Sequence, residues 1–209
     1  GGGVDAYENA LLTGSVLWDD QAIEANMSNL DNEPFGLVVR YQDTGSYYKC
    51  TLTRDGSTDT DCNGNGGGNT QGLALRRVDT SIPCAANYVV DEDLAFAFTY
   101  EQTYRMRLEV IGGQVTCTVD ADGNGIGLGN DLVVSFTDPT PLPPGNAGLY
   151  AYDSGNGLNA WLEFDDVVVE TFDPDTDLDG VPDAVELAIG SDLANPDTDG
   201  DGIDDRYEI

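Results

Sequence analysis

The chain contains no histidine, and only 8 lysine and arginine residues stand against 39 aspartate and glutamate residues, a formal net charge of −31. Without histidine, the commonest general base, the nucleophile–histidine pairs and the usual zinc ligand sets are all missing. The shortage of basic residues argues against nucleic acid as a partner, because phosphate binding needs a positively charged surface. No apolar run approaches the length of a membrane span. The sequence therefore predicts a protein that neither binds nucleic acid nor inserts into a membrane.

The size and composition suit one domain with an appendage, since the chain has 209 residues of which 40% are hydrophobic. It starts Gly1-Gly2-Gly3 rather than with Met and shows no signal peptide, so we interpret it as a processed chain whose export signal has been removed. A chain this acidic repels itself, and bound cations would relieve part of that repulsion. We expect folding or assembly to depend on such cations.

Residues 1–170 contain short apolar or alternating runs separated by turn-forming residues, and no segment there has helical periodicity over three turns. Ile111-Gly-Gly-Gln114 is a two-residue hairpin signal. The sequence predicts an all-β, antiparallel jelly-roll sandwich, because each sheet must bury one face against the other. The expected strands are Asn9–Trp18, Ala22–Met27, Gly36–Tyr41, Tyr47–Thr53, Leu73–Val78, Leu94–Tyr100, Tyr104–Ile111, Val115–Val119, Leu132–Phe136, Ala147–Tyr152 and Ala160–Glu170.

The most specific pattern lies at residues 173–209, where a twelve-residue pattern occurs twice, 22 residues apart. Each copy has acids at positions 1, 3, 5, 9 and 12, a Gly at position 6, and at position 7 a residue that offers its carbonyl oxygen. This is the ligand order of a calcium loop, in which Ca²⁺ takes six to eight oxygen ligands. The predicted ligands are Asp175, Asp177, Asp179, Val181, Asp183 and Glu186 in the first loop and Asp197, Asp199, Asp201, Ile203, Asp205 and Glu208 in the second.

A weaker version of the pattern lies in a strand connection at Asp120–Asp131. Asp120, Asp122 and Asn124 occupy positions 1, 3 and 5, and Asp131 occupies position 12. Position 9 has no ligand side chain, and position 12 is Asp rather than Glu. Both a further calcium site and a polar glycine-rich loop are consistent with these residues.

The boundary between the two parts is expected near Pro174, since a proline holds the residue before it in an extended conformation. We predict a sandwich over residues 1–170 and a calcium-loop extension over residues 171–209. Ala184–Ile189 can form a short helix with Gly190 as its C-cap. No long helix precedes Asp175, and the sequence stops one residue after Glu208. We therefore expect the element that packs on the second loop to be missing, disordered or supplied by something else.

The four cysteines form no Cys-x-x-Cys pair, and beside calcium loops they indicate disulfides in an oxidising exterior. Three connectivities are possible. Strand alternation points both Cys50 and Cys117 at a core, whereas Cys62 and Cys84 lie in polar connections. We therefore favour the pairs Cys50–Cys117 and Cys62–Cys84.

Two segments of the sandwich carry a family resemblance. Residues 35–48 (FGLVVRYQDTGSYY) and 104–120 (YRMRLEVIGGQVTCTVD) resemble hairpins of laminin-G-like, concanavalin-type jelly rolls, a group that includes the C-terminal domain of thrombospondins. Residues 148–152 and 164–167 look like the closing strands of that fold. The resemblance covers most of residues 10–170 and implies the same sandwich.

The extension is similar to thrombospondin type 3 calcium repeats of secreted proteins. This resemblance implies Ca²⁺ at the two ligand sets above and a location outside the cell or on its surface. Dockerins share the loop, but they normally carry a helix after each loop, and the second helix is absent here.

Our first hypothesis is a non-enzymatic, secreted structural or adhesive protein whose calcium-loop extension is a stiff connector to neighbouring subunits or domains. In its sharpest form the chain is the protomer of an extracellular fibre: the second loop docks on a neighbour, and the glycine-rich start receives it.

The alternative is a carbohydrate-binding module of a polysaccharide-degrading system. Exposed aromatic rings would then contact glycans, and the candidates are Tyr47, Tyr150 and Tyr152, each of which could instead be a packing residue. A glycosidase is a further alternative, because residues 163–170 (EFDDVVVE) superficially resemble a retaining active strand. The last Glu falls at the wrong spacing for that role, so we expect no enzymatic activity.

Overall fold

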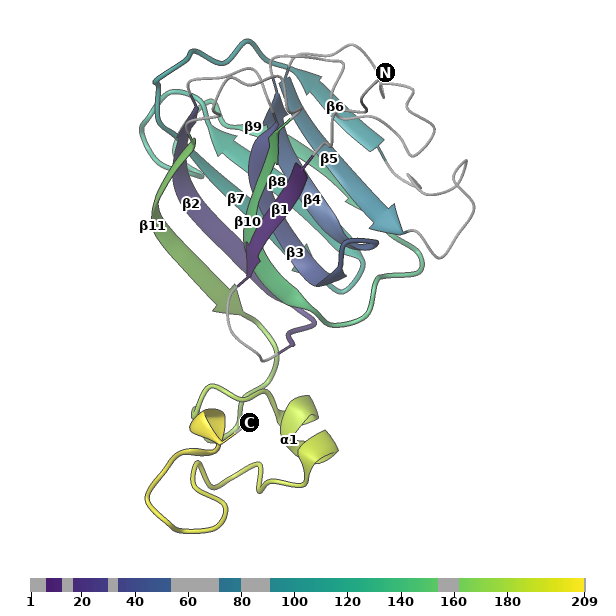
Figure 1. The fold of residues 1–209 in the computed structure, drawn as a ribbon, viewed down its shortest axis with the longest axis vertical. Coiled ribbons are helices and arrows are strands. Elements are labelled where there is room, and N and C mark those ends of the chain that lie inside the picture. The colour runs from purple at the N-terminus through teal and green to yellow at the C-terminus, as the bar shows by residue number, and fades with distance from the viewer. Residues whose placement is uncertain are drawn as a thin grey trace.

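A computed structural model describes residues 7–12, 17–29, 34–53, 72–79, 91–153 and 162–208. Two antiparallel sheets form a sandwich, and a smaller C-terminal extension lies beyond one end of it (Figure 1). This confirms the predicted all-β antiparallel sandwich. Strands distant in sequence pair with one another, which gives the crossovers of a jelly roll.

The larger sheet has six strands. Their spatial order is β1 (Tyr7–Leu12), β10 (Asn146–Asp153), β3 (Phe35–Asp43), β4 (Ser46–Thr53), β5 (Gly72–Asp79) and β6 (Asp91–Ala95). The smaller sheet has five strands, in the order β11 (Leu162–Thr171), β2 (Gln21–Asn29), β7 (Tyr104–Ile111), β8 (Gln114–Asp120) and β9 (Leu132–Thr137).

The core lies between the sheets and follows from strand alternation. On β7 every second residue is buried, from Tyr104 to Val110, and the residues between them are half-buried. On β8 the inward residues are Val115, Cys117 and Val119, all fully buried. Since successive side chains of a strand point to opposite faces, the period of two in the sequence places one apolar row of each strand in the core.

The strand expected over Leu94–Tyr100 differs from the structure, in which β6 spans Asp91–Ala95 and residues 96–99 form no strand. Phe98 is nevertheless buried and packs edge-on against Phe35, with ring centroids 5.7 Å apart. The apolar alternation there reflects packing at the margin of the core rather than ladder hydrogen bonds. The first strand also differs, since it spans Tyr7–Leu12, and Trp18 forms an isolated bridge with Gly145.

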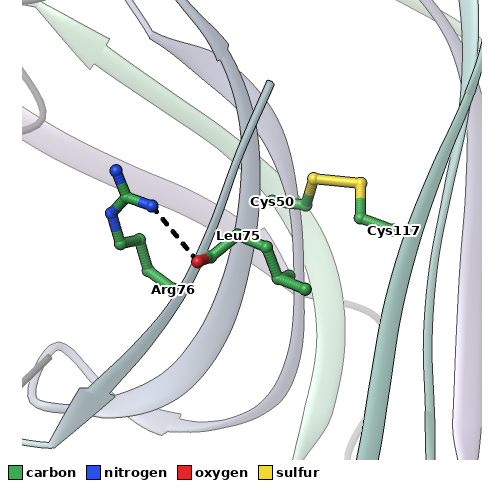
Figure 2. The surroundings of a disulfide bond; sticks show 4 residues. All are labelled: Cys50, Leu75, Arg76 and Cys117. Atoms are coloured by element: carbon green, nitrogen blue, oxygen red, sulfur yellow. Dashed lines mark hydrogen bonds between the residues drawn. A yellow bond between two sulfur atoms is a disulfide. The ribbon is translucent and has the colours of Figure 1, made fainter. Parts of the chain in front are cut away.

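A disulfide joins the two sheets through the core. Cys50 on β4 and Cys117 on β8 are both fully buried, and their Cα atoms lie 6.2 Å apart. Figure 2 shows the bond bridging the sheets, while the neighbouring Arg76 points away from it and donates from Nη1 to the carbonyl oxygen of Leu75 at 3.2 Å. This is the pair that strand alternation favours. Cys62 and Cys84 lie outside the described residues.

The extension contains a helix, α1 (Asp183–Ile189), and a 3-10 turn, η2 (Asp205–Tyr207). Gly190 ends α1 in the left-handed conformation at φ 89°, and its NH donates to the carbonyl oxygen of Glu186 at 2.7 Å, as expected of a glycine C-cap. In the part of the chain that the structure describes, no helix has the length and apolarity needed to cross a membrane.

Candidate metal centre

The first aspartate of each C-terminal loop winds the backbone around its own carboxylate. Asp175 accepts hydrogen bonds from the NH groups of Leu178 at 2.8 Å and Gly180 at 3.0 Å. Asp197 accepts the equivalent bonds from Gly200 and Gly202, both at 2.8 Å. The two loops therefore have the same local structure, as their repeated sequence predicts.

Two residues in each loop adopt left-handed backbone angles, which produces the tight turn. At position 6 both loops have glycine, with φ 97° at Gly180 and 95° at Gly202. At position 4 the second loop has Gly200 at φ 74°, whereas the first has Leu178 at φ 63° with its side chain 83% exposed. Leucine pays a steric penalty in this region that glycine does not.

The turn brings three carboxylates together in each loop. Single oxygens of Asp175, Asp177 and Asp179 all lie within 4.8 Å of one another, and the second loop forms the same cluster from Asp197, Asp199 and Asp201. Carboxylate oxygens at such spacing are the ligands that Ca²⁺ takes.

The first loop also buries acceptors that have no hydrogen-bond donor. Asp179 is only 4% exposed and Glu186 is fully buried, yet Asp179 Oδ2, Glu186 Oε2 and Asp177 Oδ2 accept no hydrogen bond. Buried polar atoms are nearly always paired, and an unpaired buried charge is strongly unfavourable. Asp177 and Asp179 also belong to the three-acid cluster, so a cation held there would give their unpaired oxygens a partner, and the residues present fit the predicted ion.

The acids at position 9 each accept hydrogen bonds from a threonine of their own loop. Asp183 accepts hydrogen bonds from the NH of Thr176 at 2.7 Å and from its hydroxyl at 2.8 Å. Asp205 accepts the same pair from Thr198, at 2.9 and 2.7 Å. Both carboxylates therefore brace the start of their loop, and in calcium loops position 9 often reaches the ion through a water molecule. The repeated Asp-Thr-Asp at positions 1 to 3 was a sequence signal for this brace.

The backbone closes both loops in the same way, because Pro174 and Pro196 accept hydrogen bonds from the NH groups of Asp183 at 2.8 Å and Asp205 at 2.9 Å. The loops also approach each other. A Cβ placed on Gly180 would lie 3.6 Å from Cδ of Arg206, the sole basic residue of the extension.

The second loop is much more open than the first. Its position-7 residue, Ile203, is 47% exposed, whereas the equivalent Val181 is fully buried. Its position-12 residue, Glu208, is exposed and borders an open hollow of about 290 Å³ that Ile189 and Ser191 also line. The two loops therefore offer equivalent oxygen ligands, but those of the first loop are more deeply buried.

Burial and mutual repulsion shift two carboxyl groups of the first loop. Burial raises the pKa of Glu186, and the charges of Asp177 and Asp179 raise it further. Burial, followed by the charges of Asp179 and Asp175, also raises the pKa of Asp177. In the second loop the NH and hydroxyl of Thr198 lower the pKa of Asp205.

Without calcium, the extension is expected to become more stable as the pH is lowered from 7 to about 5. Carboxyls whose pKa is raised by folding bind more protons in the folded chain, so a lower pH favours folding. The lowered pKa of Asp205 makes the extension less stable at low pH, but only when the pH falls to the ordinary pKa range of carboxyl groups, near about 4. With Ca²⁺ the trend should reverse, because protons compete with the ion for the same oxygens. Thermal melts at the two pH values, in chelator and in Ca²⁺, test this; a higher stability at pH 7 in chelator would contradict it.

The loop at residues 120–131 reproduces only part of this geometry. Asp120 accepts hydrogen bonds from the NH groups of Gly123 and Gly125, both at 2.7 Å, the same spacing as in the other two loops. Burial raises the pKa of Asp120, but these NH groups outweigh it and the pKa is lowered.

The other acids of this loop differ in their hydrogen bonds. Asp122 accepts a hydrogen bond from the NH of Asn130 at 3.3 Å, and Asp131 Oδ1 is buried without a partner. Asp120, Asp122 and Asp131 form no three-acid cluster of the kind found among the described residues of the extension. Asn124, at position 5 between Asp122 and Gly125, is the remaining candidate ligand.

The predicted glycan-binding tyrosines are not exposed platforms where the structure describes them. Tyr47 is 2% exposed and Tyr150 is 3% exposed, and both pack with Val38 in a small cluster on the outer side of the six-stranded sheet. Tyr47 also contacts Tyr41, with ring centroids 5.3 Å apart. The expectation of exposed rings is therefore wrong for these two residues. The side chain of Tyr152 lies outside the described part of the chain.

Comparisons with known proteins give likeness in structure alone. No family model matches the sequence, and no curated protein matches it. Among solved structures, a carbohydrate-binding module from Bacillus subtilis has a TM-score of 0.52 at 14% identity, over 78% of this chain and 82% of the module. The exoplasmic/lumenal domain of VIP36, bound to Ca²⁺ and Man3GlcNAc, has a TM-score of 0.51 at 10% identity, over 80% of this chain and 75% of that one. The chain shares their fold. At these identities the likeness shows the fold alone.

Proposed function

We propose that this chain is a non-enzymatic, calcium-binding structural or adhesive protein outside the cell or on its surface. Residues 1–170 form its sandwich, and residues 171–209 form an extension that Ca²⁺ holds rigid. The observation that carries the proposal is the buried set of unpartnered oxygens on Asp177, Asp179 and Glu186. The sandwich-crossing disulfide supports an oxidising location, since such bonds are rare in the cytosol.

Calcium turns the extension from a self-repelling segment into a stiff one. Residues 171–209 contain 13 acids and a single base, Arg206. Coordination replaces the repulsion between neighbouring carboxylates with attraction to a shared ion. We propose that the first loop binds Ca²⁺ more tightly than the second, because its oxygen ligands are already buried. We propose residues 120–131 as a third, weaker site.

The second loop is proposed as the contact to a neighbouring subunit or domain, which in the sharpest form builds a fibre. Its exposed Ile203 and Glu208 support this, because a partner would cover them. Sedimentation in Ca²⁺ and in chelator tests it. Calcium-dependent assembly is expected, and a chain that stays monomeric in Ca²⁺ would remove the fibre hypothesis while leaving the calcium sites in place.

Thermal melting with Ca²⁺ and with chelator tests the calcium proposal itself. At a free concentration about 1,000 times Kd, an ion stabilises the folded state by about 4 kcal/mol, and for a chain of this size each 1 kcal/mol raises Tm by about 2–4 °C. We therefore expect the Tm of the extension to rise by about 8–16 °C. Identical melts in the two conditions would refute calcium binding.

Glycan binding by the sandwich is the second candidate function. The fold likeness to a carbohydrate-binding module and to a glycan-bound lumenal domain favours it. Because Tyr47 and Tyr150 are buried, a glycan would have to contact other residues. Binding on a broad glycan array would support this candidate, and no binding across the array would count against it.

A further inference from the structure

Each residue of the connection between the sandwich and the extension takes part in strand pairing or in a hydrogen bond. Thr171 ends β11, paired with Gln21. The NH of Phe172 donates to the carbonyl oxygen of Asp20 at 2.8 Å. Asp173 follows, then Pro174, whose carbonyl oxygen is bonded to the first calcium loop. No residue between β11 and the first loop is a free linker.

The carboxylate of Asp173 is the centre of this connection. Its Oδ2 accepts the NH of Asp19 and its Oδ1 accepts the NH of Asp20, both at 2.7 Å. These residues are more than 150 positions away in sequence, in the segment that leads into β2. Hydrogen bonds to a charged acceptor are among the stronger ones in proteins, and two on one carboxylate also fix its orientation.

Behind this contact, a buried arginine holds the segment that receives it. Arg40 is 1% exposed, and its guanidinium forms an ion pair with Asp19 at 2.6 Å. It also donates to the carbonyl oxygens of Asp19 at 2.7 Å, Leu142 at 2.7 Å and Gly112 at 2.9 Å. Its own backbone is left-handed, at φ 47°, beside the irregular register between β3 and β4. Strained residues of this kind persist only where their surroundings hold them.

A second carboxylate links the same segment to the β7–β8 hairpin. Asp20 Oδ1 accepts the NH of Gly112 at 2.6 Å, at the tip of the turn. The receiving segment is thus fastened to Arg40 of β3 and to Gly112 of the β7–β8 turn, and Arg40 in turn binds the connection at Leu142. A carboxylate docked there has a rigid base.

We propose that Asp173, docked on the Asp19 and Asp20 amides over Arg40, is a rigid joint that sets the direction in which the extension leaves the sandwich. This goes beyond the proposed function, since it concerns the end of the sandwich and holds whether or not ions fill the loops. A fixed joint allows the extension to transmit a defined spacing and orientation to whatever it contacts. A flexible linker would lose that definition.

Replacing Asp173 by Ala tests the joint, with Asp192→Ala as the matched control. Asp192 is an exposed acid outside both twelve-residue loops, so the control makes the same change in charge. Hydrogen exchange should show that protection of the Asp19 and Asp20 amides falls about tenfold or more in Asp173→Ala. Small-angle scattering should show a broader range of overall dimensions. In the Asp192→Ala control, both the amide protection and the range of dimensions should stay unchanged.

Three results would overturn the proposal. One is unchanged protection of the Asp19 and Asp20 amides in Asp173→Ala. Another is unchanged scattering. The third is loss of protection throughout β2 and β7, which would make Asp173 a general stability residue. Asp173→Asn, which keeps one acceptor oxygen, should give an intermediate effect. Repeating the comparison in chelator separates the two proposals, because the joint should persist even if Ca²⁺ has no effect on the chain.

Discussion

Replacing Glu186 by Gln is expected to weaken Ca²⁺ binding at the first loop by about 100-fold or more, while stabilising the extension in chelator. The loss should exceed the 10–100-fold seen when only a group behind a metal ligand is changed, because Glu186 is itself the predicted position-12 ligand. The gain in chelator has a separate cause. Glu186 is fully buried, and its Oε2 has no donor. Gln removes that buried charge and supplies an NH₂ group in place of a bare oxygen.

Calorimetric titration and thermal melting together measure both effects. Glu208→Gln is the matched control, since Glu208 occupies the same position of the second loop but is exposed. It should weaken only the second binding event and stabilise the chain in chelator less than Glu186→Gln does, because Glu208, whose pKa desolvation and the neighbouring aspartates also raise, is exposed. Opposite signs in chelator and in Ca²⁺ identify a buried metal ligand, because a residue that serves only packing would shift both melts the same way. If Glu186→Gln titrates like the unmodified chain, the first loop is not a calcium site.

The second large effect concerns the disulfide. Replacing Cys50 and Cys117 together by Ala is expected to lower the free energy of unfolding by about 4 kcal/mol in the chain-entropy model. The reason is that the bond closes a long loop, with a sequence separation of 67, and so restricts the unfolded chain. Because both side chains are buried between the sheets, their truncation adds a packing loss.

Urea unfolding monitored by tryptophan fluorescence gives the value. The double variant avoids reductant, which would also break the predicted Cys62–Cys84 bond. The melt of the extension provides an internal control, since its calcium response should not depend on this bond. A loss under about 1 kcal/mol would mean that the bond adds little to the packing of β4 against β8.

The elements themselves were predictable because their signals are local. Tyr104–Ile111 was located from alternation alone, and the structure has the same strand bounds. The same alternation turned Cys50 and Cys117 toward one core. The turn of the first C-terminal loop depends on Asp175 and on the NH groups of residues three and five positions later, so a few consecutive residues determine its geometry.

Burial was harder to predict, because alternation assigns each side chain to one face of the sheet but does not determine what packs against that face. Tyr47 does lie on the strand face opposite Cys50, as expected, yet that face is buried there too. The exposed-ring hypothesis failed for this reason. The hydrogen bonds of the position-9 acids were not predicted either, since Asp183 and Asp205 both bind a threonine seven residues earlier.

By itself, the sequence determined the period of each strand, the two carboxylate loops and the absence of histidine chemistry, since each is a property of neighbouring residues. Only the tertiary structure decided that the loops differ in burial and that Asp173 docks on the amides of Asp19 and Asp20 over Arg40. The two contacts of Asp173 join residues more than 150 positions apart, and nothing in the local sequence of either partner specifies the other. Whether a carboxylate is an exposed acid, a buried ligand or a joint depends on what the fold places around it.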